Sequence, residues 1–233
     1  MEFDSVQIGV PDLDRGSMSY ERLLRVRPLV LPSGARRFQL RRGAVELESG
    51  TPGVHSVRFV VRASDDPGRA RVGVRSIHGL RAHFDAAGAA AAPGARESDG
   101  VDGIDHIVVH SSNLERAIAT WRDELGIRLA LDREFPHRGL RMLFFRSAGV
   151  TLEFVSSVPP PAERDAPDRF YGMAYHVGHM EAHRDLLVGD GIDVTAVRPG
   201  HKPGTVVATV RSGTEGVPTL LIGDLGNIKR PGD

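Results

Sequence analysis

The chain has no cysteine, which excludes disulfides, thiolate metal sites and a cysteine nucleophile. It has no excess of one charge either, because 30 basic side chains stand against 30 acidic ones, so a nucleic-acid partner is not expected. No apolar run approaches the ~18 residues of a membrane span. The first residues, Met1–Asp4, lack the basic and then apolar order of a signal peptide. These absences predict a cytoplasmic protein with no membrane partner and a small molecule as its ligand.

The residues that are present are typical of a folded protein. A chain of 233 residues has room for one or two domains. A hydrophobic content of 40% with 26% charged residues allows a sizeable core. Aromatic residues make up only 6% of the chain, and the single tryptophan, Trp121, is expected to lie in a helix core.

An internal repeat organises the chain. Residues 4–15 and 105–116 share one pattern, a short apolar strand, a polar cap and an amphipathic helix. Asp12 and either Ser112 or Asn113 are the expected N-caps. Each helix is followed by three strand-like segments bounded by turns, at 26–31, 36–40 and 44–48, and at 128–132, 140–145 and 150–155. The predicted order is therefore β-α-β-β-β, twice.

A second pair of copies follows less regularly. Residues 71–75 and 76–87 predict a strand and a helix, and residues 173–190 predict the same two elements. The later copy continues with three predicted strands, at 193–197, 205–210 and 219–222. The earlier copy is expected to be cut short after 89–92, and the strand-like segment 54–61 has no place in this pattern.

Two linkers divide these copies. Residues 95–103 are polar and contain glycine, and residues 158–168 contain three successive prolines that favour an extended spacer. The repeat and the first linker predict two paired-unit domains, at residues 1–100 and 101–233.

The third copy resembles the vicinal-oxygen-chelate superfamily, also called the glyoxalase, bleomycin resistance protein and dioxygenase group. The matching segments are 105–109, 113–117, 121–126 and 149–154. Four copies in one chain also resemble the two-domain extradiol dioxygenases. The resemblance implies an α+β fold in which four βαβββ-type units, the second truncated, pair into two glyoxalase-like domains. Curved mixed sheets would then surround a concave site.

The resemblance also implies one divalent metal, held by a histidine on a first strand and a glutamate on a last strand. His106 and Glu153 occupy these positions in the third copy. Side chains two apart on a strand share a face, so His106 and His110 point the same way, and Glu153 points away from its apolar neighbours. An imidazole and a carboxylate suit Fe, Mn, Ni or Zn. The alternative is a hydrogen-bonded histidine and a solvent-facing glutamate with no metal.

The other copies lack these ligands. In the first copy Ser5 stands at the histidine position and Leu47 at the glutamate position. In the fourth copy Gly172 stands at the histidine position and either Leu220 or Leu221 at the glutamate position. The domain at 1–100 is therefore expected to bind no metal, and the domain at 101–233 is expected to carry the site.

Other polar side chains are candidates for binding and proton transfer. His110 and His176 stand at equivalent places in their strands and are the candidate catalytic residues, or else solvated strand-end histidines. The candidate substrate-binding residues are His137, Arg141 and Tyr175. For His137 and Arg141 the alternative is plain exposure to solvent.

The favoured function is a metal-dependent enzyme of the isomerase, lyase or dioxygenase type that acts on a small oxygen-rich molecule. One alternative is a metal-free protein that binds or sequesters a small molecule, as bleomycin resistance proteins do. Another is an enzyme without a cofactor that uses histidines for proton transfer. Four copies in one chain allow either a monomer or a homodimer.

Overall fold

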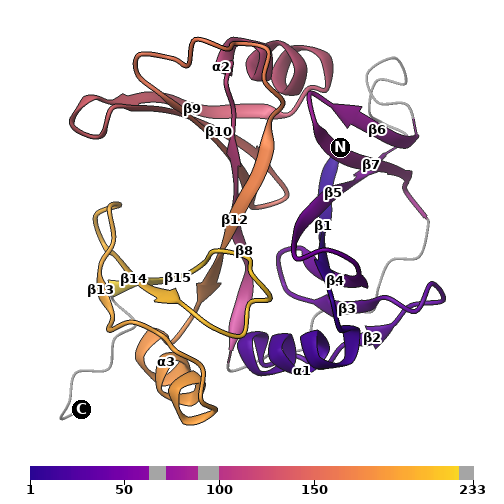
Figure 1. Cartoon of the computed structure of the whole chain (residues 1–233), viewed down its shortest axis with the longest axis vertical. Coiled ribbons are helices and arrows are strands. Elements are labelled where there is room, and N and C mark those ends of the chain that lie inside the picture. Colours follow the sequence, from indigo (N-terminus) through magenta and orange to yellow (C-terminus); the bar gives the residue numbers. More distant parts are fainter. Residues whose placement is uncertain (63–71, 89–99, 226–233) are drawn as a thin grey trace. The chain divides into compact units, whose positions relative to one another are not determined.

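The computed structural model describes residues 1–62, 72–88 and 100–225, which form two mixed β-sheets and a few helices (Figure 1). The seven-stranded sheet has the order β2-β3-β4-β1-β5-β7-β6. Its strands are β1 (Glu2–Val10), β2 (Leu29–Val30), β3 (Arg36–Gln39), β4 (Ala44–Ser49), β5 (Gly53–Val61), β6 (Gly73–Ile77) and β7 (Leu80–Ala86). Neither sheet closes into a barrel, and the mixed sheets with a few helices confirm the predicted α+β class.

The eight-stranded sheet has the order β13-β14-β15-β12-β8-β11-β10-β9. Its strands are β8 (Val101–His110), β9 (Arg128–Phe135), β10 (Leu140–Ser147), β11 (Val150–Ser157), β12 (Arg169–Val177), β13 (Arg198–Pro199), β14 (Thr205–Val210) and β15 (Thr219–Asp224). We call β8–β11 the third repeat, residues 101–157, and β12–β15 the fourth repeat, residues 169–224.

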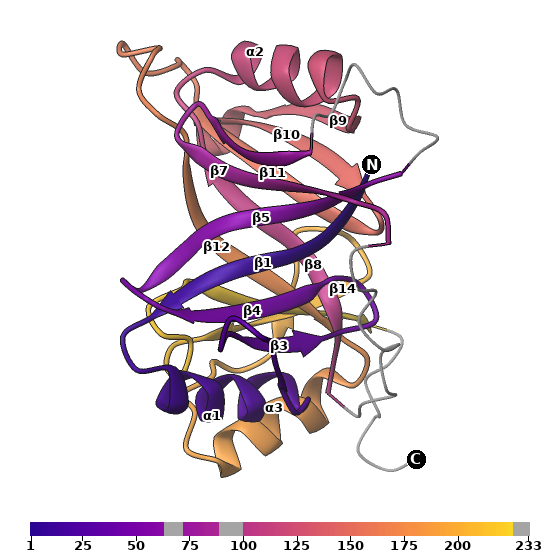
Figure 2. The ribbon, with the colours of Figure 1, turned by 90° about the vertical axis from the view of Figure 1, so that its right-hand side faces the viewer.

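Two of the three α-helices begin at predicted polar caps. Helix α1 (Leu13–Leu24) is capped by the Asp12 carboxylate, which accepts from the Arg15 amide, and Figure 2 shows it beside β3 and β4. Helix α2 (Leu114–Ala117), capped by Asn113, continues as a π-helix over Ile118–Glu124. Helix α3 (Met180–Gly189) starts after His179 without a side-chain cap. A 3₁₀ turn, Pro136–Arg138, joins β9 to β10.

The helix predicted at 76–87 is wrong. This stretch forms a hairpin of β6 and β7 whose turn, His78–Gly79, has positive φ angles at both residues. Leu80, Ala82 and Phe84 are buried and alternate with more exposed neighbours, a period of two that fits a strand and not a helix. Two apolar residues seven apart, Ile77 and Phe84, imitate a helical spacing.

The segment at 54–61 that had no predicted place is β5. It runs parallel to β7 and lies between β1 and β7 in the sheet. The strand predicted at 193–197 is reduced to one bridge between Val194 and Val210, and the short β13 follows it. The predictions for residue 71, for 89–92 and for 95–99 of the first linker lie outside the described residues.

Contacts divide the chain into two compact units. The first comprises Met1–Gln7, Val54–Ala92 and His106–Gly172, and the second comprises Ile8–Gly53, Pro93–Asp105 and Met173–Asp233. Each compact unit combines segments from both of the predicted domains, 1–100 and 101–233. The domain bounds stay a prediction.

Aromatic rings form much of the core of the first unit. Trp121 is fully buried, as predicted, with its ring centroid 6.1 Å from that of Phe59 and 5.6 Å from that of Phe154. The second unit has a more aliphatic core around Tyr20, in which Leu23, Leu47, Leu187 and Leu221 are fully buried.

Candidate functional site

The predicted metal ligands lie on two neighbouring parallel strands of the first unit. In the pairing of β11 with β8, Thr151 stands opposite His106 and Glu153 stands opposite Val108. Because partners in register project to the same face, His106 and Glu153 share a face and are diagonal neighbours. Both side chains are half-buried, whereas the intervening Ile107 and Leu152 point into the core. The strand parity expected from the sequence is present.

These two donors fit two positions around a divalent metal and do not make a complete site. Among the residues that the structure describes, no group of three His, Cys, Asp or Glu side chains is placed to hold a metal ion. In the first copy of the sequence pattern, Ser5 and Leu47, which stand at the two ligand positions, are both fully buried. Any further coordination positions would have to be filled by oxygens of a substrate or by water.

The equivalent pair in the fourth repeat carries no donor. Counted from the N-cap of each helix, Gly172 stands where His106 does and Ala174 stands where Val108 does. Ala174 pairs with Leu220, so Leu220 and not Leu221 takes the place of Glu153. The register thus settles the alternative that the sequence left open.

His110 ends β8 on the same face as His106 and is exposed to solvent. The Tyr171 ring stacks on its imidazole, with the centroids 4.5 Å apart and the planes 13° from parallel. Partial burial, helped by the positive charge of Arg169, lowers the pKa of His110. His110 is therefore neutral at pH 7, the form that accepts a proton.

His176 lies in the second unit, near the end of β12, between carboxylates of two other strands. Its Nδ1 is 3.1 Å from Oδ2 of Asp102 on β8, and its Nε2 is 3.6 Å from Oδ2 of Asp224 on β15. The imidazole is half-buried. This arrangement can hold the ring in a fixed orientation.

The three predicted substrate-binding residues have different surroundings. Arg141 donates to both oxygens of Asp132 and to Glu115, and these carboxylates raise its pKa. His137 is exposed on the 3₁₀ turn. Tyr175 is fully buried in the core of the second unit, and this burial raises its pKa. Their roles toward a substrate stay predictions.

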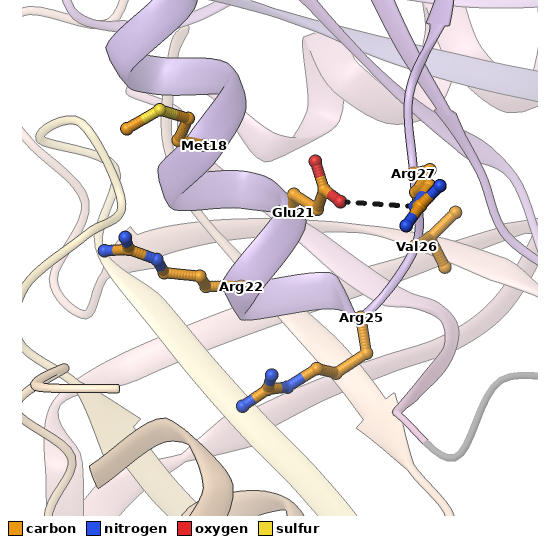
Figure 3. Close-up of a pocket in the computed structure, with 6 residues that line it drawn as sticks. All are labelled: Met18, Glu21, Arg22, Arg25, Val26 and Arg27. Carbon is orange, nitrogen blue, oxygen red and sulfur yellow. Dashed lines mark ion pairs between the residues drawn. The ribbon is translucent and has the colours of Figure 1, made fainter. Parts of the chain in front are cut away.

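A pocket of the second unit lies at the end of α1 and contains none of the predicted site residues. Its volume is about 410 Å³, and Figure 3 shows its lining: Met18, Glu21, Arg22, Arg25, Val26 and Arg27. Glu21 and Arg27 form an ion pair across 3.8 Å, and Arg25 is paired with Asp190. These pairs neutralise two of the three arginines.

Three residues near the candidate histidines had no signal in the sequence. Asp102, Tyr171 and Asp224 meet their histidines only through pairing between strands that are far apart in the chain. Nothing in their local spacing distinguishes them from other polar or aromatic strand residues.

Comparison with known proteins supports the predicted resemblance. Residues 105–209 match the model of the Glyoxalase/Bleomycin resistance protein/Dioxygenase superfamily. No curated protein matches the chain by sequence.

Several solved structures share the fold over most of the chain. The Mn(II)-bound glyoxalase from Novosphingobium aromaticivorans is 18% identical, with a TM-score of 0.70, and the match covers 99% of this chain and 88% of that one. The 2,2',3-trihydroxybiphenyl 1,2-dioxygenase from Sphingomonas wittichii is 13% identical, with a TM-score of 0.68 and coverage of 95% and 90%. A halotolerant catechol dioxygenase is 12% identical, with a TM-score of 0.66 and coverage of 95% and 86%.

The fold and the matched segment indicate the class of proteins that this chain resembles. The chain has the fold of the vicinal-oxygen-chelate superfamily and, over residues 105–209, the sequence pattern of its glyoxalase and dioxygenase members. The similar structures include a Mn(II)-bound glyoxalase and a 2,2',3-trihydroxybiphenyl 1,2-dioxygenase. No helix among the described residues is both long and apolar enough to cross a membrane.

Proposed function

We propose that this protein is an enzyme of the isomerase, lyase or dioxygenase type that acts on a small oxygen-rich molecule with the help of a divalent metal. One observation carries the proposal: His106 and Glu153 share a half-buried face of two adjacent parallel strands. Both are ligand types that Fe, Mn, Ni and Zn accept. The Mn(II)-bound glyoxalase with the same fold supports a metal of this kind.

The residues of the chain divide the work. His106 and Glu153 would hold the metal, and the substrate would complete its coordination. A bound divalent metal polarises substrate oxygens and stabilises negative charge that develops on them. His110, kept neutral by its lowered pKa, would accept a proton, and the Tyr171 ring fixes the plane of its imidazole. His176 is the second proposed acid or base, and His137, Arg141 and Tyr175 are the proposed substrate-binding residues.

Metal titration tests this function. The protein is stripped with a chelator and titrated with Mn(II), Fe(II), Ni(II) and Zn(II) by calorimetry. We expect His106→Ala and Glu153→Gln each to weaken binding about tenfold or more, since even residues that only orient a metal ligand change affinity by that much. His201→Ala removes an exposed histidine outside the candidate site; it is the matched control and should leave the affinity unchanged. Absence of binding, or binding that survives both ligand substitutions, overturns the proposal.

The incomplete ligand set favours a second candidate, a metal-free protein that binds a small molecule. Gly172 and Leu220, which carry no donor atom, stand at the ligand positions of the fourth repeat, and no described cluster of three donors compensates. Catechol, a vicinal diol, separates the two candidates. An enzyme with a metal site should bind catechol only when metal is present, whereas a binding protein should bind it equally well after chelation.

Light scattering of the same sample decides between a monomer and a homodimer.

A further inference from the structure

A polar cluster outside the His106 and Glu153 pair is built around His176 in the second unit. In the sheet order β15-β12-β8, the strand that carries His176 lies between the strands that carry Asp224 and Asp102. One ring nitrogen faces each carboxylate, Nδ1 toward Asp102 at 3.1 Å and Nε2 toward Asp224 at 3.6 Å. The cluster is graded in exposure, because the side chains of His176 and Asp102 are 19% and 24% exposed and that of Asp224 is 63% exposed.

These distances indicate which nitrogen of the neutral His176 ring carries the hydrogen. An ionised carboxylate has no hydrogen to give, so the contact between Nδ1 and Asp102 is a hydrogen bond only if Nδ1 is the donor. The Asp224 oxygen, at 3.6 Å, lies beyond hydrogen-bond range and does not require a hydrogen on Nε2. The neutral ring therefore carries its hydrogen on Nδ1, and the lone pair of Nε2 is available.

The backbone at Asp102 and directly after it is held in place. The Arg41 amide donates to the Asp102 carbonyl at 3.0 Å, and Gly103 bridges to Arg42. A Cβ atom at Gly103 would lie 2.6 Å from the Cβ of Arg42, so only glycine allows this approach. Asp102 thus approaches His176 from a fixed strand and not from a mobile loop.

We infer that Asp102 is a positioning residue that holds His176 in the Nδ1–H tautomer, so that Nε2 acts as a proton acceptor. In the step itself, Nε2 takes the proton of an acidic O–H or C–H group of the substrate, and the electron pair of that bond stays on the substrate. The imidazolium then lies between the carboxylates of Asp102 and Asp224. This inference rests on the proposed function in one respect, the assignment of His176 as an acid or base.

Nitrogen-15 NMR of the histidine side chains tests the tautomer directly. In the full-length protein at pH 9, we expect the two ring nitrogens of His176 to show a protonated Nδ1 and an unprotonated Nε2. In Asp102→Ala the Nε2–H form should become populated, because the Nδ1–H form has lost the carboxylate that accepts its hydrogen bond. The matched control is Asp190→Ala, which removes a carboxylate of the same unit that is paired with Arg25 and not with a histidine. This control should leave the His176 signals unchanged.

Chemical modification provides a second measurement. Diethyl pyrocarbonate attacks an unprotonated imidazole nitrogen, and peptide mass spectrometry reports the rate at each histidine. In Asp102→Ala the ring hydrogen is expected to lie partly on Nε2, which leaves less unprotonated Nε2 to react, so we expect this substitution to slow modification of His176 severalfold. Asp224→Ala should slow it less. A thermal unfolding scan of each variant confirms that it is folded.

Three outcomes overturn the inference: a wild-type His176 with its hydrogen on Nε2, a tautomer that Asp102→Ala does not change, or an equal change in the Asp190→Ala control. None of these measurements involves a metal, so their failure is distinguishable from failure of the metal titration at His106 and Glu153. If the tautomer is as expected and no metal binds, Asp102 still positions His176 and the metal-dependent function is wrong.

Discussion

In the third repeat β8 leads through Asn113 into α2, and in the fourth repeat β12 leads through His179 into α3. In each repeat the last strand returns parallel to the first, β11 beside β8 and β15 beside β12. The backbone plan is the same, but the side chains at matched positions differ in kind.

Three matched positions show the difference. His106 corresponds to Gly172 and Glu153 to Leu220, so only the third repeat carries the candidate metal donors. At the end of the strand both repeats have a histidine, but His110 stacks on an aromatic ring whereas His176 lies between carboxylates. The comparison teaches that the strand framework supports the fold without the donors, and that a histidine at the same place has different neighbours in the two repeats.

The largest expected effect concerns the helix core. Counted from the caps, Trp121 in the third repeat corresponds to Leu187 in the fourth, and both are fully buried. Truncating a buried side chain costs the transfer free energy and a cavity, so we expect Trp121→Ala to lower the free energy of unfolding by ~4 kcal/mol and Leu187→Ala by ~3 kcal/mol. Urea unfolding measures both. A loss below ~1 kcal/mol for Trp121→Ala would show that its burial in the first unit is misassigned, and Trp121→Phe is the milder control.

The next effect is acid sensitivity confined to the fourth repeat. His183 is fully buried, and its desolvation, with the charge of Arg25, lowers its pKa to about 4. Its counterpart in the third repeat is Ala117. The unfolded chain binds the proton more tightly than the folded chain does. Protonation of His183 therefore lowers the free energy of unfolding as the pH falls below about 6.5. We expect a loss of ~3 kcal/mol as the pH falls from 6.5 to 4.

The control for this loss is His183→Ala, which copies the residue of the third repeat. Urea unfolding at pH 7 and at pH 4 should show a smaller difference for this variant than for the wild type. Equal differences in the two proteins would contradict a neutral, buried His183.

The smallest expected effect concerns the helix caps. The Asn113 side chain accepts from the Arg116 amide, whereas His179 makes no side-chain cap bond. We expect Asn113→Ala to cost ~1 kcal/mol, because it removes the cap. His179→Asn should add ~0.5 kcal/mol, since it supplies one. If both substitutions shift the urea midpoint in the same direction, the caps do not distinguish the two repeats.

Local patterns predicted much of this fold. The caps at Asp12 and Asn113, the helix core position of Trp121 and the strands around His106 and Glu153 follow from spacing that one short segment contains. Parity along a strand was enough to place Glu153 on the face opposite to its apolar neighbours. Each of these features depends on residues within a few positions of one another.

The errors and omissions come from contacts between distant segments. A helix was predicted at 76–87 because its apolar residues fit two periods, and only the pairing of β7 with β5 decides between them. The partners of His176 come from strands that are far away in the chain. A single sequence contains no signal for such pairings, so the environment of the candidate acid–base residue could not be predicted.

The register between β8 and β11 has a consequence for how this protein tolerates insertions. Glu153 stands between Leu152 and Phe154, which are buried in the core. A slip of β11 by one residue would turn Phe154 to the half-buried face and push the carboxylate into the core. A residue added to the loop before β11 leaves the register of the strand unchanged. A residue added within the strand, ahead of Glu153, moves the Glu153 side chain to the opposite face of the sheet. The burial of Leu152 and Phe154 thus fixes the face on which the candidate ligand Glu153 lies.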